Sequence, residues 1–276
     1  MYLIVQSAQL SDADIGNLVA LCDATEYAQL GEHAARIRAH PSSPGVAEYC
    51  AQRSLDCAWI PENRRRDQVG LVAMDMDSTL ITIECIDEIA DMQGIKPQVA
   101  AITASAMRGE IDFAESLRRR VALLAGLDVA ALERVYTERL RLSPGAEQML
   151  AAFKAVGARS LLVSGGFTYF TERLKNRLGL DRTLSNVLEI EGGRLTGRVE
   201  GAIVDGDAKA EALRQMQGES WMQGRLAVGI GDGANDLPML AAADVSVAYH
   251  AKPVVRQQTT HQVDYSGLDA VANLFV

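Results

Sequence analysis

The chain has 276 residues, of which 48% are hydrophobic and 23% charged, and this suits a soluble globular protein of one large domain or of one domain with a small addition. Its net charge of −9 argues against a nucleic-acid-binding surface. No apolar run reaches the length of a membrane-spanning helix, and the first residues are too short and uncharged a stretch for a signal peptide, so we expect a cytoplasmic protein that binds neither nucleic acid nor membrane.

Residues 1–66 look separate from the rest of the chain. Their apolar patterns predict an edge strand, two helices and, after a break rich in proline and serine, a third helix, at residues 2–5, 12–22, 27–39 and 46–60. The charged residues 61–67 then predict a connector in which Arg64, Arg65 and Arg66 are solvated. No catalytic pattern is visible here, so we expect a small N-terminal α/β accessory segment of unknown role.

Three of the four cysteines, Cys22, Cys50 and Cys57, lie in this segment, and the fourth is Cys85. They fall in no metal-ligand spacing, so free thiols in a reducing cytoplasm are expected. An amino-acid-sensing domain and a dimerising domain are two hypotheses for residues 1–66. The oligomeric state therefore stays open, and a homodimer is one of the arrangements.

The stretch V-G-L-V-A-M-D-M-D-S-T-L-I, at residues 69–81, carries the first chemical signal. Val69–Met74 is typical of a strand that is buried on both faces. Two carboxylates, Asp75 and Asp77, follow it, and apolar residues then resume. A carboxylate at the end of a buried strand is costly unless a cation or hydrogen-bond donors compensate for it. The two acids therefore lie at a packed junction, which favours chemistry over an ordinary Asp-rich turn.

Helix signals fill the next stretch, about residues 84–141. Gly94 ends one helix, and Pro97 opens the next. The residues D-F-A-E, at 112–115, form a capping-box pattern that starts a third helix, and Asp128 caps a fourth. Four helices inserted after the first strand predict a small helical cap that could cover the strand ends as a lid.

Alternation of helices and strands resumes after this insertion. The predicted elements are a helix, a buried strand, a helix, a hairpin, a helix and two strands, at residues 143–157, 160–163, 168–178, 188–199, from Asp207 onward, 226–230 and 245–248. Strand–helix repetition of this kind predicts an α/β fold with a mainly parallel, doubly wound sheet.

Polar residues follow three of these strands, in the sequences D-M-D-S-T, S-G-G-F and G-D-G-A-N-D. The carboxyl ends of parallel strands share one edge of a sheet, where ligands bind, so we expect the three clusters to converge. Asp75, Asp77 and Asp232 offer hard oxygen ligands in low number, which suits Mg²⁺. Ser164 and the backbone N–H groups of Gly165 and its neighbour, at a helix start, would form a phosphate cradle.

These motifs, in this order and with Lys209 between the last two, resemble those of the haloacid dehalogenase superfamily of aspartate-nucleophile phosphatases. The resemblance is closest to one branch, the phosphoserine phosphatases, because residues 84–90 read E-C-I-D-E-I-A and residues 116–121 read S-L-R-R-R-V. It covers about residues 69–260. It implies a Rossmann-like core in residues 67–276 with a helical cap at about 84–141, and it leaves residues 1–66 unexplained.

The resemblance also implies a Mg²⁺-dependent mechanism. Asp75 would attack phosphorus and become an aspartyl phosphate. Asp77 would protonate the leaving oxygen and later take a proton from the hydrolytic water. Asp75, Asp232 and the backbone carbonyl of Asp77 would hold the Mg²⁺ ion.

The same resemblance implies roles for the other polar residues. Ser164, Gly165 and Lys209 would hold the phosphate oxygens. Asn235 would contact the phosphate or the attacking water, and Asp236 would support Lys209 or the metal. Together with the mechanism, these roles predict a phosphoric monoester hydrolase.

Two cap residues indicate the substrate. By resemblance, Glu84 meets an ammonium group and Arg120 a carboxylate, as the substrate O-phosphoserine requires in the last step of serine biosynthesis. The competing interpretation of Glu84 is an ordinary acid at a helix N-terminus. That of Arg120 is a solvated arginine beside Arg118 and Arg119. A phosphatase or phosphotransferase for a related amino-acid phosphate such as phosphohomoserine stays open, as does a non-catalytic regulator that binds Mg²⁺ and phosphate.

Overall fold

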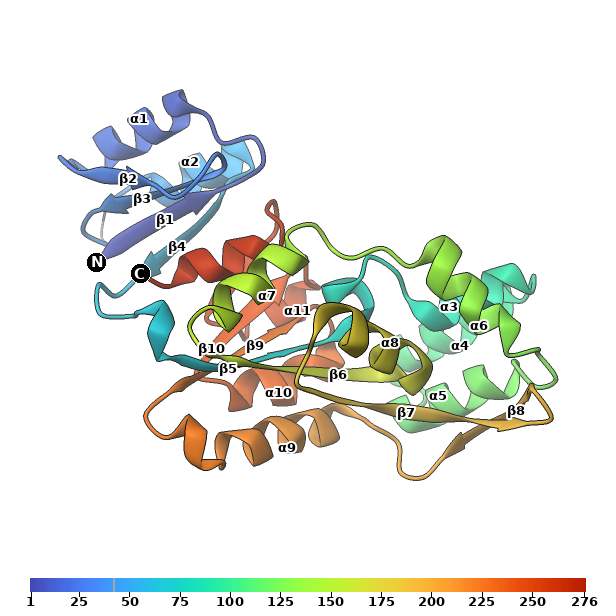
Figure 1. Cartoon of the computed structure of the whole chain (residues 1–276). Helices are drawn as coiled ribbons and strands as arrows, with labels where there is room; N and C mark the ends of the chain where they lie inside the picture. Colours follow the sequence, from blue (N-terminus) through green and yellow to red (C-terminus); the bar gives the residue numbers. More distant parts are fainter. Residues whose placement is uncertain (42) are drawn as a thin grey trace.

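The computed structural model describes residues 1–41 and 43–276 and contains a four-stranded and a seven-stranded sheet (Figure 1). The strands are β1 (Tyr2–Gln6), β2 (Tyr27–Gln29), β3 (Ala34–Arg38), β4 (Asp56–Ile60), β5 (Val69–Met74), β6 (Arg159–Phe167), β7 (Arg182–Glu191), β8 (Arg194–Glu200), β9 (Leu226–Gly231), β10 (Val245–Tyr249) and β11 (His261–Val263). The α-helices are α1 (Asp12–Leu21), α2 (Val46–Arg53), α3 (Cys85–Met92), α4 (Lys96–Met107), α5 (Phe113–Ala122), α6 (Ala130–Arg134), α7 (Ala146–Lys154), α8 (Thr168–Leu178), α9 (Gly206–Gln217), α10 (Leu237–Ala242) and α11 (Pro253–Arg256). Two further helical turns matter below, η2 (Met76–Leu80) and η6 (Leu268–Leu274).

Residues 1–60 build the smaller unit, an antiparallel sheet of order β2-β3-β1-β4 with α1 and α2. Side chains alternate between the two faces of a strand, so Leu3 and Val5 of β1 face the same way. They join α1 and α2 in one apolar cluster. Ile4, between them, is fully buried on the opposite face. Both faces of this small sheet are therefore covered.

Three predictions for this unit need correction. The first strand is central and not an edge, because β1 pairs with β3 on one side and β4 on the other. Residues 27–39 form β2 and β3 and not a helix. Residues 46–60 divide at Ser54, whose φ of 54° ends α2, and continue as β4. Short apolar segments fit both periods, and only pairing with distant strands decides between them. Part of the predicted break, residue 42, lies outside the described residues.

The larger sheet confirms the predicted α/β class. Its strand order is β11-β10-β9-β5-β6-β7-β8, and all neighbours are parallel except β7 and β8, which form the predicted hairpin. In β5, Val72 and Met74 pack with α7, α8 and η6 on one face. Leu71 and Ala73 pack with α9 and α10 on the other. The strand is buried throughout, as a strand between two helical layers must be.

Helices α3 to α6 lie between β5 and α7 in the chain and stand at the end of the molecule opposite residues 1–60 (Figure 1). The predicted helix signals are confirmed. Gly94 follows α3 with a φ of 71°, and Pro97 lies in the first turn of α4. The Asp112 carboxylate accepts the N–H of Glu115 at 2.7 Å at the start of α5. The domain boundaries and the lid function stay predictions.

The second face of the small sheet packs on the C-terminal segment of the chain. The Asp56 carboxylate, at the start of β4, accepts the backbone N–H groups of Asp264 and Tyr265 at 2.7 and 3.0 Å. The Gln6 amide donates to the carbonyl of Ala270 at 3.2 Å and accepts from Asn273 at 3.0 Å. Asp56 and Gln6 are buried side chains of the small unit and bond mostly to backbone groups of the larger one, so the two units meet in an ordered interface.

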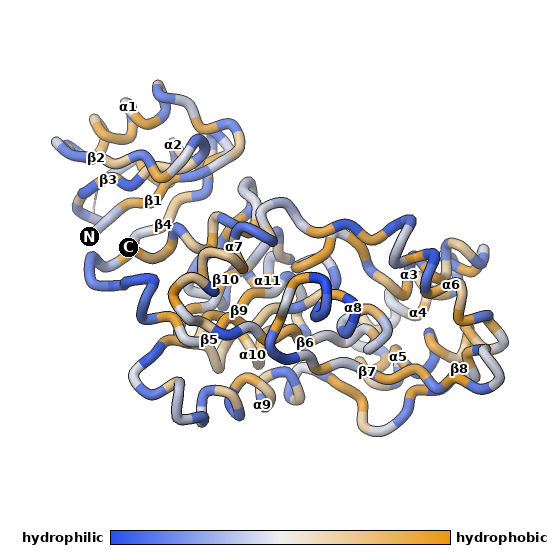
Figure 2. The backbone as a smooth tube through the Cα atoms, in the orientation of Figure 1, coloured by the Kyte–Doolittle hydropathy of each residue, from blue (hydrophilic) through white to orange (hydrophobic). Residues whose placement is uncertain are grey.

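The connector between the units appears as a blue, hydrophilic stretch in Figure 2, but two of its arginines are not solvated as predicted. Arg64 lies 3.0 Å from His261 Nε2, and Arg66 donates to the carbonyl of Ala272 at 3.0 Å. Arg65 matches the prediction, because it is exposed and pairs with exposed Asp67. No helix among the described residues is long and apolar enough to span a membrane.

Candidate active site

The loops that follow β5, β6 and β9 are neighbours, because β5 lies between the other two strands. After β5, Asp75 is extended and the η2 loop folds back tightly. Ser78 adopts a left-handed φ of 56°, and its N–H donates to the carbonyl of Ile83 at 3.2 Å. The predicted convergence of strand ends therefore places Asp75 and Asp77 beside the loops that carry Ser164 and Asp232.

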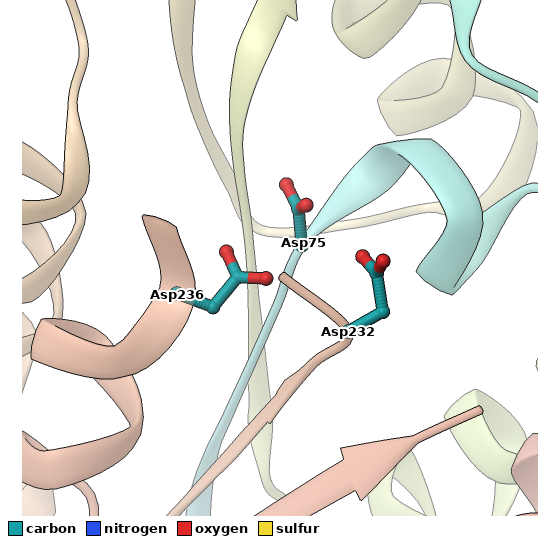
Figure 3. Close-up of side chains that lie close together, drawn as sticks. All are labelled: Asp75, Asp232 and Asp236. Carbon is teal, nitrogen blue, oxygen red and sulfur yellow. The ribbon is translucent and has the colours of Figure 1, made fainter. Parts of the chain in front are cut away.

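Three carboxylates gather at this edge. One oxygen from each of Asp75, Asp232 and Asp236 lies within 4.8 Å of the other two (Figure 3). Asp75 follows β5, Asp232 follows β9, and Asp236 directly precedes α10. Asp75 and Asp236 are buried, whereas Asp232 is half-buried. The cluster contains the side chains of two predicted metal ligands and one residue that was predicted to act behind them.

Lys209 is fully buried against this cluster. Its Nζ donates to Asp75 Oδ1 and to Asp236 Oδ1, both at 2.7 Å. The second Asp236 oxygen accepts the N–H of Gly233 at 3.0 Å, so both of its oxygens are engaged. Burial opposes the charged form of Lys209, but the carboxylates of Asp236 and Asp75 outweigh burial and raise its pKa. Asp236 thus fixes a charged ammonium group beside Asp75.

The Asp77 side chain points toward the cap. Its Oδ1 accepts the N–H of Cys85, the first residue of α3, at 3.1 Å. Burial, together with the nearby charge of Glu84, raises the pKa of Asp77 to about 7. A carboxyl group with such a pKa can both give and take a proton near neutral pH. This is the property that an acid–base catalyst needs.

The carboxylate cluster is chemically suited to a divalent cation. Burial first, and then the charge of Asp236, raise the pKa of Asp75 well above its usual range and that of Asp232 to about 6. Acids crowded in this way ionise fully only when positive charge is added. Carboxylate oxygens are the hard ligands that such cations prefer. The residues present therefore fit a metal ion that would relieve the repulsion.

The S-G-G sequence lies at the end of β6 and not at a helix start as predicted, because β6 continues to Phe167 and α8 begins at Thr168. Ser164 is buried, and its Oγ accepts the N–H of Gly166 at 2.8 Å. A Cβ at Gly166 would lie 2.9 Å from Asp77 Oδ2 and 3.0 Å from Ser164 Oγ. Glycine is therefore needed for the close approach of this strand end to Asp77.

A cavity of about 690 Å³ joins these loops to the helical cap. It is lined by most of the predicted site residues, namely Asp75, Asp77, Glu84, Arg120, Ser164, Gly165, Asp232 and Asn235. Lys209 and Asp236 lie behind Asp75, where they contact it and each other. The structure therefore brings all ten predicted residues to one place.

Glu84 and Arg120 face this cavity from the cap side. Glu84 accepts the hydroxyl of Ser78 at 2.8 Å, and burial raises the pKa of its carboxyl group. Arg120 donates to the carbonyl of Ser116 at 3.3 Å, and burial lowers its pKa, although a guanidinium keeps its charge in proteins. Its neighbour Arg119 is exposed and pairs with Glu115 on the same helix.

Sequence reasoning missed many of the residues that line the cavity, among them Met107, Phe113, Lys252 and Val254. Lys252 follows β10, and its N–H donates to the carbonyl of Asp232 at 3.1 Å. The expectation that polar residues after parallel strands converge at one edge of the sheet could therefore have found it. The Phe113 ring approaches Gly165 so closely that a Cβ there would lie 2.7 Å from Cζ. An aromatic residue in the first turn of a helix gives no such signal.

Comparison with known proteins agrees with this geometry. The family model of haloacid dehalogenase-like hydrolases matches residues 72–241. A phosphoserine phosphatase of Polaromonas sp. is 54% identical over 209 residues, which are 74% of this chain and 89% of that protein. A hydrolase of the same family from Salmonella enterica serovar Typhi superposes with a TM-score of 0.87 at 32% identity, covering 99% of this chain and 98% of the other. A probable phosphoserine phosphatase from Vibrio cholerae gives 0.81 at 37% identity, covering 99% and 85%.

The buried Asp75 thus lies beside a charged lysine and lines one cavity with a second acid, and the chain belongs to the phosphoserine phosphatase branch of the haloacid dehalogenase-like hydrolases.

Proposed function

We propose that this chain hydrolyses O-phosphoserine to serine and phosphate through an aspartyl-phosphate intermediate. One observation carries the substrate assignment: the cavity that holds Asp75 and Asp77 also exposes cap residues of both charge signs, among them Glu84 and Arg120. Phosphoserine carries an ammonium and a carboxylate group beside its phosphate. The names of the relatives from Polaromonas and Vibrio cholerae support the same substrate.

Asp75 is the proposed nucleophile. Its Oδ1 is held by Lys209 at 2.7 Å, which fixes the carboxylate and leaves Oδ2 to attack phosphorus. The bond from phosphorus to the serine oxygen breaks as the bond to Asp75 forms. Ser164, Gly165 and Asn235 line the same space and would donate to the phosphate oxygens.

Asp77 is the proposed acid and base. With a pKa of about 7 it is partly protonated at neutral pH and can give its proton to the departing serine oxygen. The resulting carboxylate can then take a proton from the water that attacks the aspartyl phosphate. The N–H of Cys85 holds the side chain in place for both steps.

Mg²⁺ is the proposed metal, held by Asp75, Asp232 and the backbone carbonyl of Asp77. When bound, it would offset negative charge on the transferring phosphoryl group. Asp236, whose oxygens are taken by Lys209 and Gly233, would support the lysine and not the metal. The low number of protein oxygens leaves positions for water and substrate, as Mg²⁺ prefers.

The surroundings of the site suggest further proposals. Helices within residues 84–141 would form a lid over the core of residues 67–276, because Glu84, Arg120 and Phe113 face the strand ends. Residues 1–66 would be an accessory unit. A reducing cytoplasm is the proposed compartment, since Cys22, Cys50, Cys57 and Cys85 are all free thiols.

A panel of phosphorylated metabolites tests the proposal. Phosphate release should be fastest with O-phosphoserine, should stop in excess chelator and should return with Mg²⁺, while Ca²⁺ should restore it poorly. Preference for phosphohomoserine, or transfer to an acceptor other than water, would replace the substrate assignment. Absence of release from every compound would favour a non-catalytic regulator, and full activity in chelator would end the metal assignment.

A further inference from the structure

The small N-terminal unit holds two cysteine side chains in contact, far from the reaction just described. Cys50 lies on α2 and Cys57 on β4, and their thiol groups share a hydrogen bond. Cys50 is 1% exposed, whereas Cys57 is half-buried. Neither residue lines the cavity of the candidate active site. The contact therefore has no part in the proposed phosphatase chemistry.

The backbone makes this contact a constrained one. In the sheet register Cys57 pairs with Val5 of β1, so both side chains point to the helix-bearing face. Ser54, with a φ of 54°, reverses the chain after α2, and the N–H of Leu55 donates to the carbonyl of Cys50 at 2.9 Å. This tight reversal brings the start of β4, with Cys57, back to the end of α2, with Cys50.

Cys22 is the one other thiol in the same apolar cluster. It lies at the end of α1, is 8% exposed and hydrogen-bonds to Ser43. The hydrogen-bond partner of Cys50 is thus Cys57, whereas that of Cys22 is Ser43. Burial raises the pKa of Cys22, whereas the hydrogen bond from Cys50 lowers that of Cys57.

We propose that Cys50 and Cys57 are a modification site, at which hydrogen peroxide converts the two thiols into a reversible disulfide. The Cys57 sulfur attacks one peroxide oxygen, the O–O bond breaks, and water and a sulfenic acid form. The Cys50 sulfur then attacks the sulfenic sulfur, the S–O bond breaks, and a second water leaves. Two thiols and one peroxide thereby give one disulfide and two waters, so that sulfur is oxidised and peroxide reduced.

The exposure of the pair suits this order of events. Peroxide can reach Cys57, which is partly exposed, whereas Cys50 is buried in the apolar interior and hydrogen-bonded to Cys57. A resolving thiol held next to the reactive one captures the sulfenic acid before a second peroxide can oxidise it further. The chain between the two residues is short, and the disulfide would join α2 to the strand whose first residue, Asp56, docks on the larger unit.

The test uses the full-length reduced chain. It is treated with hydrogen peroxide, quenched in acid, unfolded, alkylated and examined by peptide mass spectrometry. We expect two of the four thiols to be lost, a cross-link between the peptides of Cys50 and Cys57, and recovery of both thiols with dithiothreitol. Cys22→Ser is the matched control and should give the same cross-link.

Two variants make the result decisive. In Cys50→Ser, we expect a sulfenic acid on Cys57 that dimedone captures, and in Cys57→Ser no cross-link should form. Phosphate release by each variant shows that it is folded. A Cys22–Cys50 cross-link, a Cys57 oxidised without a partner in the wild-type chain, or four unchanged thiols after treatment would each overturn the proposal.

Discussion

Buried aspartates occur in both units of this molecule, and their surroundings differ. In the small unit Asp14 is 2% exposed, and its carboxylate accepts from the side chains of Arg53 at 2.9 Å, Tyr49 at 2.8 Å and Ser11 at 2.6 Å. The hydrogen bond from Arg53 is the main reason that the pKa of Asp14 is lowered. Its charge is fully compensated by donors.

The buried acids of the cavity are crowded by each other. Asp75 shares one lysine with Asp236 and lies near Asp77, and burial and these charges raise its pKa. A compensated acid stabilises the fold, whereas a crowded one lowers its stability and remains available for a cation and a substrate. The difference between Asp14 and Asp75 therefore separates a structural carboxylate from a reactive one.

The largest effect that we expect is from Asp75→Asn. The amide cannot act as the nucleophile, so phosphate release should drop at least about a thousandfold. The folded-state pKa of Asp75 lies above the unfolded one, so its ionisation opposes folding at neutral pH, and a neutral side chain removes this cost. Urea unfolding without metal should show no loss of stability. A clear loss of unfolding free energy would show that Asp75, like Asp14, is a carboxylate that stabilises the fold.

Arg120→Ala sharpens the comparison at the cap. A charge-assisted contact to the substrate carboxylate is worth about 1.5–3 kcal/mol, so kcat/KM for phosphoserine should fall about tenfold or more. An aryl phosphate without a carboxylate should be much less affected. Glu84→Gln should show the same selectivity through the ammonium group.

The matched controls are Arg118→Ala and Arg119→Ala on the same helix. Arg119 makes an exposed pair with Glu115, and such pairs contribute little. Both controls should leave kcat/KM nearly unchanged. Equal losses on phosphoserine and on the aryl ester would show that Arg120 supports folding or closure of the cap and does not bind the substrate.

Asp14→Asn tests the other half of the comparison. Because the folded pKa of Asp14 is lowered, its stabilising effect is present above its unfolded pKa and is lost as the pH falls through the folded one. At neutral pH the variant should lose about 1–3 kcal/mol of unfolding free energy in urea. Its kcat should not change. Exposed Asp12, on the same helix, supplies the control Asp12→Asn, which should be neutral in both measurements.

The smallest effect concerns the interface between the units. Burial, and then the charge of Arg64, lower the pKa of His261 from 6.5 to about 4. Between these values the unfolded chain binds a proton that the folded chain excludes, so stability falls as the pH drops from 6.5 toward 4. The wild-type chain should lose unfolding free energy between neutral pH and a pH of about 5. In His261→Gln this loss, measured by urea unfolding, should be smaller by roughly 1–2 kcal/mol. An equal loss of unfolding free energy in the variant and the wild-type chain would mean that other groups cause the acid sensitivity.

Local patterns predicted the parallel sheet and most of the cavity, because a buried strand that ends in acids is visible within a few residues. Asp75, Asp77 and Asp232 follow this rule, and Lys252 follows it too although it was overlooked. The small unit was predicted poorly, since β3 is a strand only through pairing with β1, and β2 only through pairing with β3.

The contacts between the cap and the core were also beyond local patterns. Phe113 covers Gly165 from a helix about 50 residues earlier in the chain, and nothing in either stretch specifies their distance. Arg120 was distinguished from its two arginine neighbours by resemblance to a known motif. Physical reasoning about an isolated run of arginines would not have selected it.

The role of Asp75 as the nucleophile is tested most directly by trapping the aspartyl phosphate. The wild-type chain is mixed with O-phosphoserine that carries a radioactive phosphate and with Mg²⁺, quenched in acid within the first turnover and digested. We expect label on the peptide of Asp75, released at alkaline pH as for an acyl phosphate, and no label in Asp75→Asn. Label on Ser164, Ser78 or Thr79 would contradict this role.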